Sequence, residues 1–72
     1  MTERRTERIR EGNYVAEFEI RLLDDPQSPW SPYVDPEDVR KTDRIRLALR
    51  RGDMVAIAGE ARVYELTLLA GE

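Results

Sequence analysis

The sequence contains no cysteine and no histidine. Without cysteine the chain forms no disulfide, and without either residue a structural zinc site lacks its usual ligands. Lysine is scarce as well, because Lys41 is the only one among twelve basic residues and the other eleven are arginine. Arginine suits protein interfaces through its planar pairs with carboxylates, although a GC-rich genome would produce the same bias. These absences argue against most chemistry of small enzymes and metal-binding domains.

Long apolar runs are also missing. No stretch approaches the roughly 20 apolar residues of a membrane span, and the N-terminus has no apolar region typical of a signal peptide. We therefore expect a cytoplasmic protein that makes no membrane contact. With 72 residues, the chain is one domain near the lower limit for a self-supporting core, which supplies only about 3–5 kcal/mol at this size. Association with another chain is the expected source of further stability.

The net charge of −3 bears on possible partners. Proteins that bind nucleic acid without sequence specificity are usually basic, because they neutralise its phosphates. A general nucleic-acid binder is therefore unlikely, although a local basic patch remains compatible with this charge. General acid–base catalysis needs tuned groups in a pocket, and the carboxylates here fall mostly at helix caps, in the N-terminal segment and on a wet strand face. We expect neither an enzyme nor a bound cofactor or metal.

Residues 1–12 are almost entirely charged, with Ile9 the one apolar residue after Met1. Such a segment buries too little surface to offset the entropy lost on ordering. The composition predicts a flexible charged arm. The alternative is an arm that folds onto a partner, which would then supply the missing apolar contacts.

Residues 13–23 alternate between apolar and polar side chains, which predicts a half-buried strand with one wet face. The inward-facing set is Tyr14, Ala16, Phe18, Ile20 and Leu22. Residues 24–35 then form a proline-rich loop that contains Trp30 and Tyr33. Because apolar area is scarce, we favour Trp30 as a lid over the core. The alternative is a rigid aromatic anchor at a partner interface.

A helix is predicted from Pro36 to Arg50 or Arg51. Asp35 is suited to cap it, Pro36 fits its first position and Gly52 fits the left-handed position after its end. The face expected to pack on the strand carries Val39, Thr42, Ile45 and Leu49, with Ala48 beside them. Arg40, Arg44 and Arg51 lie on the opposite side together with Leu47. A charged helix face is usually only solvated, but a leucine among arginines fits a partner surface.

The remaining residues are less clearly patterned. Residues 53–61 fit a short second helix, and a strand leading into a hairpin is the alternative. Residues 62–69 again alternate, with Tyr64, Leu66 and Leu68 expected to face the core. Residues 70–72 should fray. The expected fold is therefore a single α+β domain over residues 13–69, in the order β-loop-α-α-β with a two-stranded sheet, or alternatively β-α-β-β. The exposed edges of so small a sheet favour completion by oligomerisation.

Several segments resemble a group of small, mostly uncharacterised bacterial proteins associated with toxin–antitoxin gene pairs. The resemblance spans roughly residues 13–68, and it is carried by Tyr14-Val15-Ala16-Glu17, Trp30-Ser31-Pro32-Tyr33, Glu37-Asp38, Lys41, Asp43, Ala48-Leu49-Arg50-Arg51-Gly52-Asp53 and Ala61-Arg62-Val63-Tyr64-Glu65-Leu66-Thr67. This chain departs from the group in residues 54–60, where an alanine-rich helix is usual, and in its longer loop at 24–29. The resemblance implies an antitoxin role.

Together these observations predict a small non-catalytic protein that binds and inhibits a cognate protein, a toxin among the candidates, or that pairs with itself as a homodimer. The sheet edge, the aromatic loop and the N-terminal arm are the expected contacts. The candidate partner-binding residues are Trp30, Tyr33, Arg40, Arg44, Leu47 and Arg51. Alternatives are a DNA-binding transcriptional regulator of ribbon–helix–helix type and a structural homo-oligomer.

Overall fold

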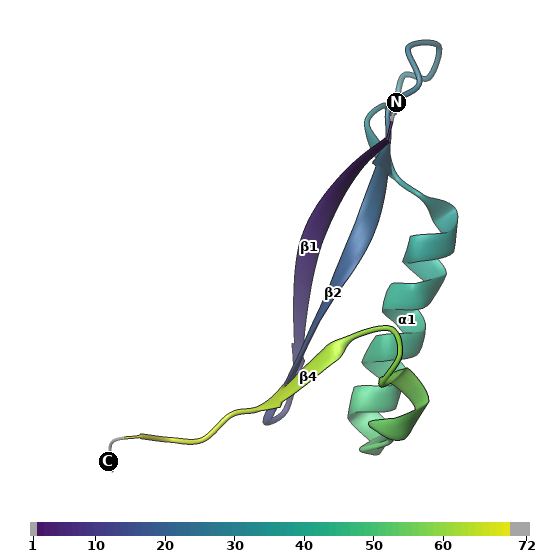
Figure 1. Ribbon diagram of the computed structural model, residues 1–72. Helices are drawn as coiled ribbons and strands as arrows, with labels where there is room; N and C mark the ends of the chain where they lie inside the picture. The colour runs from purple at the N-terminus through teal and green to yellow at the C-terminus, as the bar shows by residue number, and fades with distance from the viewer. Residues whose placement is uncertain (1, 70–72) are drawn as a thin grey trace.

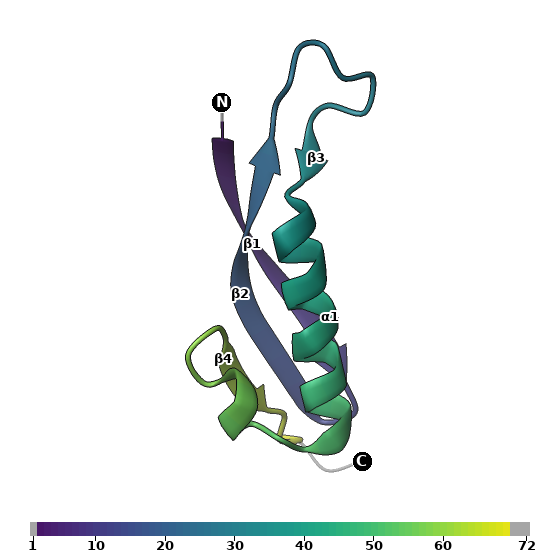
Figure 2. The ribbon, with the colours of Figure 1, turned by 90° about the vertical axis from the view of Figure 1, so that its right-hand side faces the viewer.

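The computed structural model describes residues 2–69, which form a four-stranded sheet, one α-helix and one turn of 3-10 helix. In chain order the elements are β1 (Thr2–Glu11), β2 (Tyr14–Leu23), β3 (Tyr33–Val34), α1 (Pro36–Arg51), η1 (Val55–Ile57) and β4 (Arg62–Glu65). Helix α1 lies along one face of the sheet (Figures 1 and 2). The fold is α+β, as the sequence predicts.

Strand β2 is the centre of the sheet. On one side it pairs with β1 in antiparallel register along its whole length, from Thr2↔Leu23 to Glu11↔Tyr14. Its other side is shared, because β3 pairs with the end of β2 near Leu23 and β4 pairs with the beginning, from Tyr14 to Glu17. The prediction of a two-stranded sheet is therefore wrong, because the sheet has four strands. Strands β3 and β4 pair with opposite ends of the same edge of β2 and leave a gap between them.

The N-terminal residues differ from the flexible arm that their composition predicts, since Thr2–Glu11 form β1. Gly12 and Asn13 connect β1 to β2, and Gly12 has a φ of 62°. Glycine with positive φ at the first central position is typical of a type II′ turn, which suits a tight hairpin. The pairing satisfies the backbone groups on the inner edge of β1, and ion pairs such as Arg8–Glu17 (2.8 Å) join the exposed side chains. A strand held in this way needs little apolar surface.

Helix α1 begins and ends where the sequence predicts. The Glu37 backbone N–H donates to the Asp35 carboxylate (2.9 Å), and Gly52 adopts a φ of 71° after the last turn. Both features satisfy backbone groups that a helix end leaves unpaired. Local capping residues therefore fix the boundaries of the helix.

The core lies between α1 and β2. Its buried side chains are Ala16, Phe18 and Ile20 from β2, Ile45, Ala48 and Leu49 from α1, and Ile57 from η1. The expected inward face of β2 is confirmed, and so is the Ile45–Ala48–Leu49 part of the helix stripe. Val39 lies at the margin of this stripe, with 48% of its surface exposed.

Two predictions for the C-terminal third are corrected. The second helix is reduced to the single turn η1, after which the Glu60 and Ala61 backbone N–H groups both donate to the Ile57 carbonyl and turn the chain. Strand β4 then enters in a register that places Val63 opposite buried Ala16. Val63 therefore packs on the core and Tyr64 is 47% exposed, the reverse of the expected facing.

Beyond β4, the chain extends away from the body of the molecule (Figure 1). Leu66 and Leu68, which the alternation predicts in the core, are instead 39% and 77% exposed, and Leu69 beside them is 98% exposed. The tail predicted to fray, residues 70–72, lies outside the described residues. No helix within residues 2–69 is both long and apolar enough to cross a membrane.

Candidate interaction surfaces

Asp38 fills the gap in the sheet between β3 and β4. This carboxylate is 4% exposed, and its Oδ2 accepts hydrogen bonds from the backbone N–H (2.7 Å) and the Nε (3.1 Å) of Arg21 in β2. Next to it, Lys41 Nζ donates to the carbonyl of Glu19 (2.6 Å). Helix α1 thus supplies side chains where a neighbouring strand would otherwise pair with the edge of β2.

The pKa of Asp38 reflects this structural role. Burial alone would raise the pKa of the carboxyl, but the hydrogen bonds from Arg21 and the charge of Lys41 outweigh it, and the pKa lies below its ordinary value. The hydrogen bond to Asp38 in turn raises the pKa of Arg21. Asp38 is therefore an ionised, fully paired group, which suits a structural clamp and gives it no proton to exchange at neutral pH.

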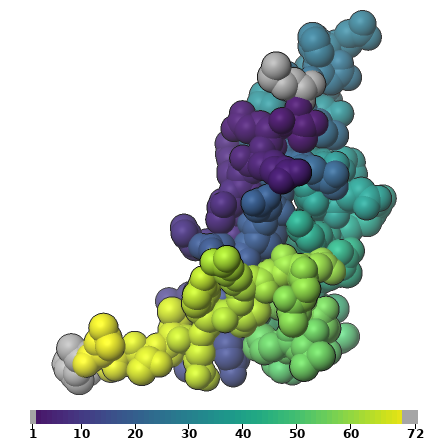
Figure 3. All heavy atoms as spheres, in the orientation of Figure 1, coloured from purple at the N-terminus to yellow at the C-terminus, as the bar shows by residue number. Residues whose placement is uncertain are grey.

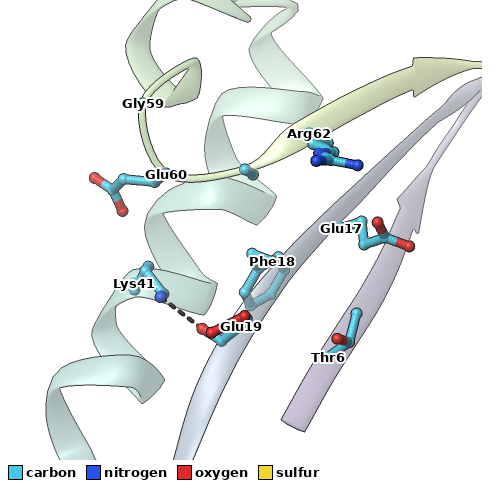
Figure 4. A pocket seen from close by; sticks show the side chains of 9 residues that line it. Thr6, Glu17, Phe18, Glu19, Lys41, Gly59, Glu60 and Arg62 are labelled. Atoms are coloured by element: carbon cyan, nitrogen blue, oxygen red, sulfur yellow. Dashed lines mark hydrogen bonds between the residues drawn. The ribbon is translucent and has the colours of Figure 1, made fainter. Parts of the chain in front are cut away.

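A polar cleft of about 440 Å³ lies beside this clamp, between α1, β2 and the start of β4. Figure 4 shows Lys41 reaching from α1 towards Glu19, with Glu17 and Arg62 on the far side. Its lysine is already engaged, and its other charged groups are three glutamates and Arg62. Among residues 2–69, no group of three or more acidic side chains is placed to hold a metal ion.

The loop of residues 24–32 forms one end of the molecule (Figure 3). It is held by its own hydrogen bonds: the Ser31 hydroxyl donates to Asp24 (2.5 Å) and accepts from the Asp25 backbone N–H (2.8 Å). The backbone N–H of Trp30 donates to the Ser28 hydroxyl (3.2 Å). Trp30 is 80% exposed at the tip, so the prediction that it covers the core as a lid is wrong. The short-range bonds hold the loop away from the core, and the tryptophan side chain faces solvent.

A second surface, here called the α1–η1 hollow, lies at the opposite end of α1. It encloses about 200 Å³ and is lined by Arg44, Leu47, Ala48, Arg51, Asp53, Ala56 and Ile57. Leu47 is 45% exposed, and Arg44 is paired with Glu60 (2.9 Å) on the rim. Its apolar lining residues are here called the floor and its charged lining residues the rim.

The structure does not bring the six candidate residues together at one surface. Arg44, Leu47 and Arg51 meet in the α1–η1 hollow. Trp30 and Tyr33 are at the other end, where Tyr33 is half-buried in β3 opposite Leu23. The sixth, Arg40, pairs with Glu37 on the exposed side of α1 (3.8 Å) and lines neither surface.

Sequence reasoning missed the part of the hollow that η1 contributes. Asp53, Ala56 and Ile57 approach α1 only because the chain reverses after Gly52. Their short apolar run fits either a helix or a strand, so no local pattern indicates this placement. The exposure of Leu68 was also missed, because alternation alone assigned this leucine to the core.

No protein-family model, no curated protein and no solved structure matches this chain.

Proposed function

We propose that this protein is a non-catalytic, antitoxin-like regulator that binds and inhibits one cognate protein, with Trp30 as the principal anchor. The single observation that carries this proposal is a tryptophan 80% exposed on a hydrogen-bonded loop. Tryptophan dominates binding energy in protein interfaces more than most residues do. A loop that is already ordered also loses little conformational entropy when it binds.

The outer edge of β1 supports the same proposal. This strand is ten residues long, and within residues 2–69 only its inner edge is paired. An unpaired edge presents a row of backbone N–H and C=O groups that a partner strand can join. Its charged side chains oppose uncontrolled pairing, so a partner would need matching charges. The N-terminal segment thus remains a proposed contact, now as a strand edge.

The resemblance to proteins of toxin–antitoxin gene pairs supports an inhibitor as the kind of regulator. It rests in part on residues 30–33, the segment that follows directly from the exposed tip of the loop. We further propose that association with the partner completes the small sheet and adds the stability that a core of this size supplies only in part.

The experiment is an affinity pull-down of the tagged protein from its host at low salt, followed by titration of the captured partner. Trp30→Ala should weaken binding by about 30-fold or more, as expected for an anchor worth at least about 2 kcal/mol. Val55→Ala is the matched control, since Val55 is 87% exposed and apolar at the far end of the molecule. It should change affinity less than about threefold.

Two results would contradict the proposal. One is a stoichiometric partner that binds the Trp30→Ala variant as tightly as the wild type. The other is capture of nucleic acid in place of protein, which would instead revive the DNA-binding alternative. Because Trp30 is mostly exposed, its substitution should leave the melting temperature unchanged, and circular dichroism can verify that the variant is folded.

A further inference from the structure

The α1–η1 hollow has the chemistry to hold an indole ring. Leu47, Ala56 and Ile57 give it an apolar floor, and its volume of about 200 Å³ admits one large side chain. Asp53 on the rim offers a carboxylate to the indole N–H, which only donates hydrogen bonds. Arg51 lies on the same rim, and a guanidinium over an indole face is a favourable cation–π arrangement.

This chain itself carries a matching group. Trp30 is its only tryptophan and is 80% exposed. The loop of residues 24–32 carries Asp24 and Asp25 but no lysine or arginine, so it is acidic. Its charge complements Arg51 on the rim of the hollow, whereas Arg44 is already paired with Glu60 (2.9 Å). We propose that the α1–η1 hollow binds the Trp30 loop of a second copy of this protein.

The two surfaces cannot meet within one molecule. The molecule is 52 Å long, with the Trp30 loop at one end and η1 at the other (Figures 1 and 3). Each copy therefore offers a loop at one end and a hollow at the other. Contacts between two different surfaces join copies head to tail, and they leave a free loop and a free hollow on every assembly unless the chain of copies closes into a ring.

The inference goes beyond the proposed function, because the α1–η1 hollow is not part of the proposed partner contact, whereas Trp30 is shared by both contacts. It adds a regulatory consequence, because a Trp30 side chain seated in a neighbouring copy is hidden from a cognate partner. Self-assembly and partner binding would then compete, and dilution of the protein would expose the anchor.

Sedimentation velocity and Trp30 fluorescence test the contact on the purified chain. From about 10 µM to about 1 mM, the range of a small transient interface, the wild-type sedimentation coefficient should rise. Over the same range the emission should shift to shorter wavelength, and acrylamide quenching should fall. Trp30→Ala removes the loop anchor and Leu47→Asp blocks the hollow, so each variant alone should remain monomeric.

A mixture of the two variants gives the decisive experiment. The Trp30→Ala chain keeps an intact hollow and the Leu47→Asp chain keeps an intact loop, so the mixture should form a 1:1 complex that grows no further. Formation of that complex also shows that both variants are folded. Val39→Asp is a matched control, because Val39 is 48% exposed on α1 but does not line the hollow, and it should assemble as the wild type does.

A wild type that stays monomeric to about 1 mM would overturn the inference, as would a mixture that gives no 1:1 complex or assembly without any change in Trp30 emission. These results are separable from failure of the proposed function, because sedimentation and Trp30 emission are measured on the purified chain in the absence of the cognate partner. Loss of partner binding in Trp30→Ala with no self-assembly of the wild type would support the proposed function and reject this contact.

Discussion

Replacement of Asp38 tests whether α1 completes the edge of β2. In Asp38→Ala, the Arg21 backbone N–H loses its acceptor at 2.7 Å and the Arg21 side chain loses its bond at 3.1 Å. Hydrogen bonds to charged groups contribute about 1.5–3 kcal/mol each. The Arg21 side chain is 46% exposed, so solvent screens its bond and most of the loss comes from the Arg21 backbone N–H. We therefore expect the free energy of unfolding to fall by about 2–4 kcal/mol.

The assay is urea denaturation followed by circular dichroism, with thermal melting as a second measurement. For a domain of this size the loss corresponds to a melting temperature lowered by roughly 10–25 °C. Glu37→Gln is the matched control, because Glu37 lies in the same first turn of α1 and is 76% exposed at its side chain. It removes the favourable interaction with the helix dipole without touching the clamp, so the loss should stay below about 1 kcal/mol.

The pH dependence gives a further test of the same group. The folded pKa of Asp38 lies below its ordinary value of 3.8, so the unfolded chain binds the proton more readily. The stability that ionised Asp38 contributes is therefore fully present above the unfolded pKa, and it is lost as the pH falls through the folded pKa. The difference in stability between wild type and Asp38→Asn should be constant above about pH 5 and should narrow below about pH 4.

Either of two outcomes would refute the claim that Asp38 stabilises the edge of β2. In one, Asp38→Ala is no less stable than Glu37→Gln at neutral pH. In the other, the difference between wild type and Asp38→Asn does not change down to about pH 3, which would mean that the carboxylate has no special environment in the folded protein.

Two further predictions concern the core and the hairpin. Ile45→Ala should lower the free energy of unfolding by about 3–4 kcal/mol in urea denaturation, because Ile45 is fully buried. The exposed control Val55→Ala should change it by less than about 0.5 kcal/mol. Equal effects of the two substitutions would contradict the assigned core. Gly12→Ala should cost about 1 kcal/mol through backbone strain alone, since no atom lies within 4 Å of the added methyl group. A neutral Gly12→Ala in the same assay would argue against the hairpin turn.

The parts of the fold that sequence predicts are those with local causes. Asp35, Pro36 and Gly52 specify the ends of α1 through their own backbone and side-chain chemistry. The alternation in β2 likewise fixes its inward face, since apolar side chains at every second position must share one side. Both elements appear with the expected facing because nothing distant in the chain competes with these signals.

Hydrophobic periodicity could not predict strand β1. Its side chains are mostly exposed and charged, so they carry no apolar pattern, and its stability comes from backbone pairing with β2. The one available signal was the pair Gly12-Asn13, a two-residue connection of the kind that joins hairpin strands. Recognition of that turn would have predicted the hairpin despite the composition of the first strand.

The candidate surfaces were predicted only in part. Helical spacing placed Arg44, Leu47 and Arg51 on one side of α1, which the structure bears out at the hollow. The other wall depends on how η1 returns to the helix, which is a tertiary property. The exposure of Trp30 depends on the hydrogen bonds of its loop, and the general scarcity of apolar area gave no information about them.

The central claim is that Trp30 anchors a cognate protein, and the emission of this single tryptophan during titration with the captured partner tests it most directly. At a protein concentration low enough to keep the chain monomeric, we predict a shift to shorter wavelength, protection from acrylamide and saturation at a fixed stoichiometry. A partner that binds while Trp30 emission and quenching stay unchanged would contradict the account, because the anchor would then remain in water within the complex.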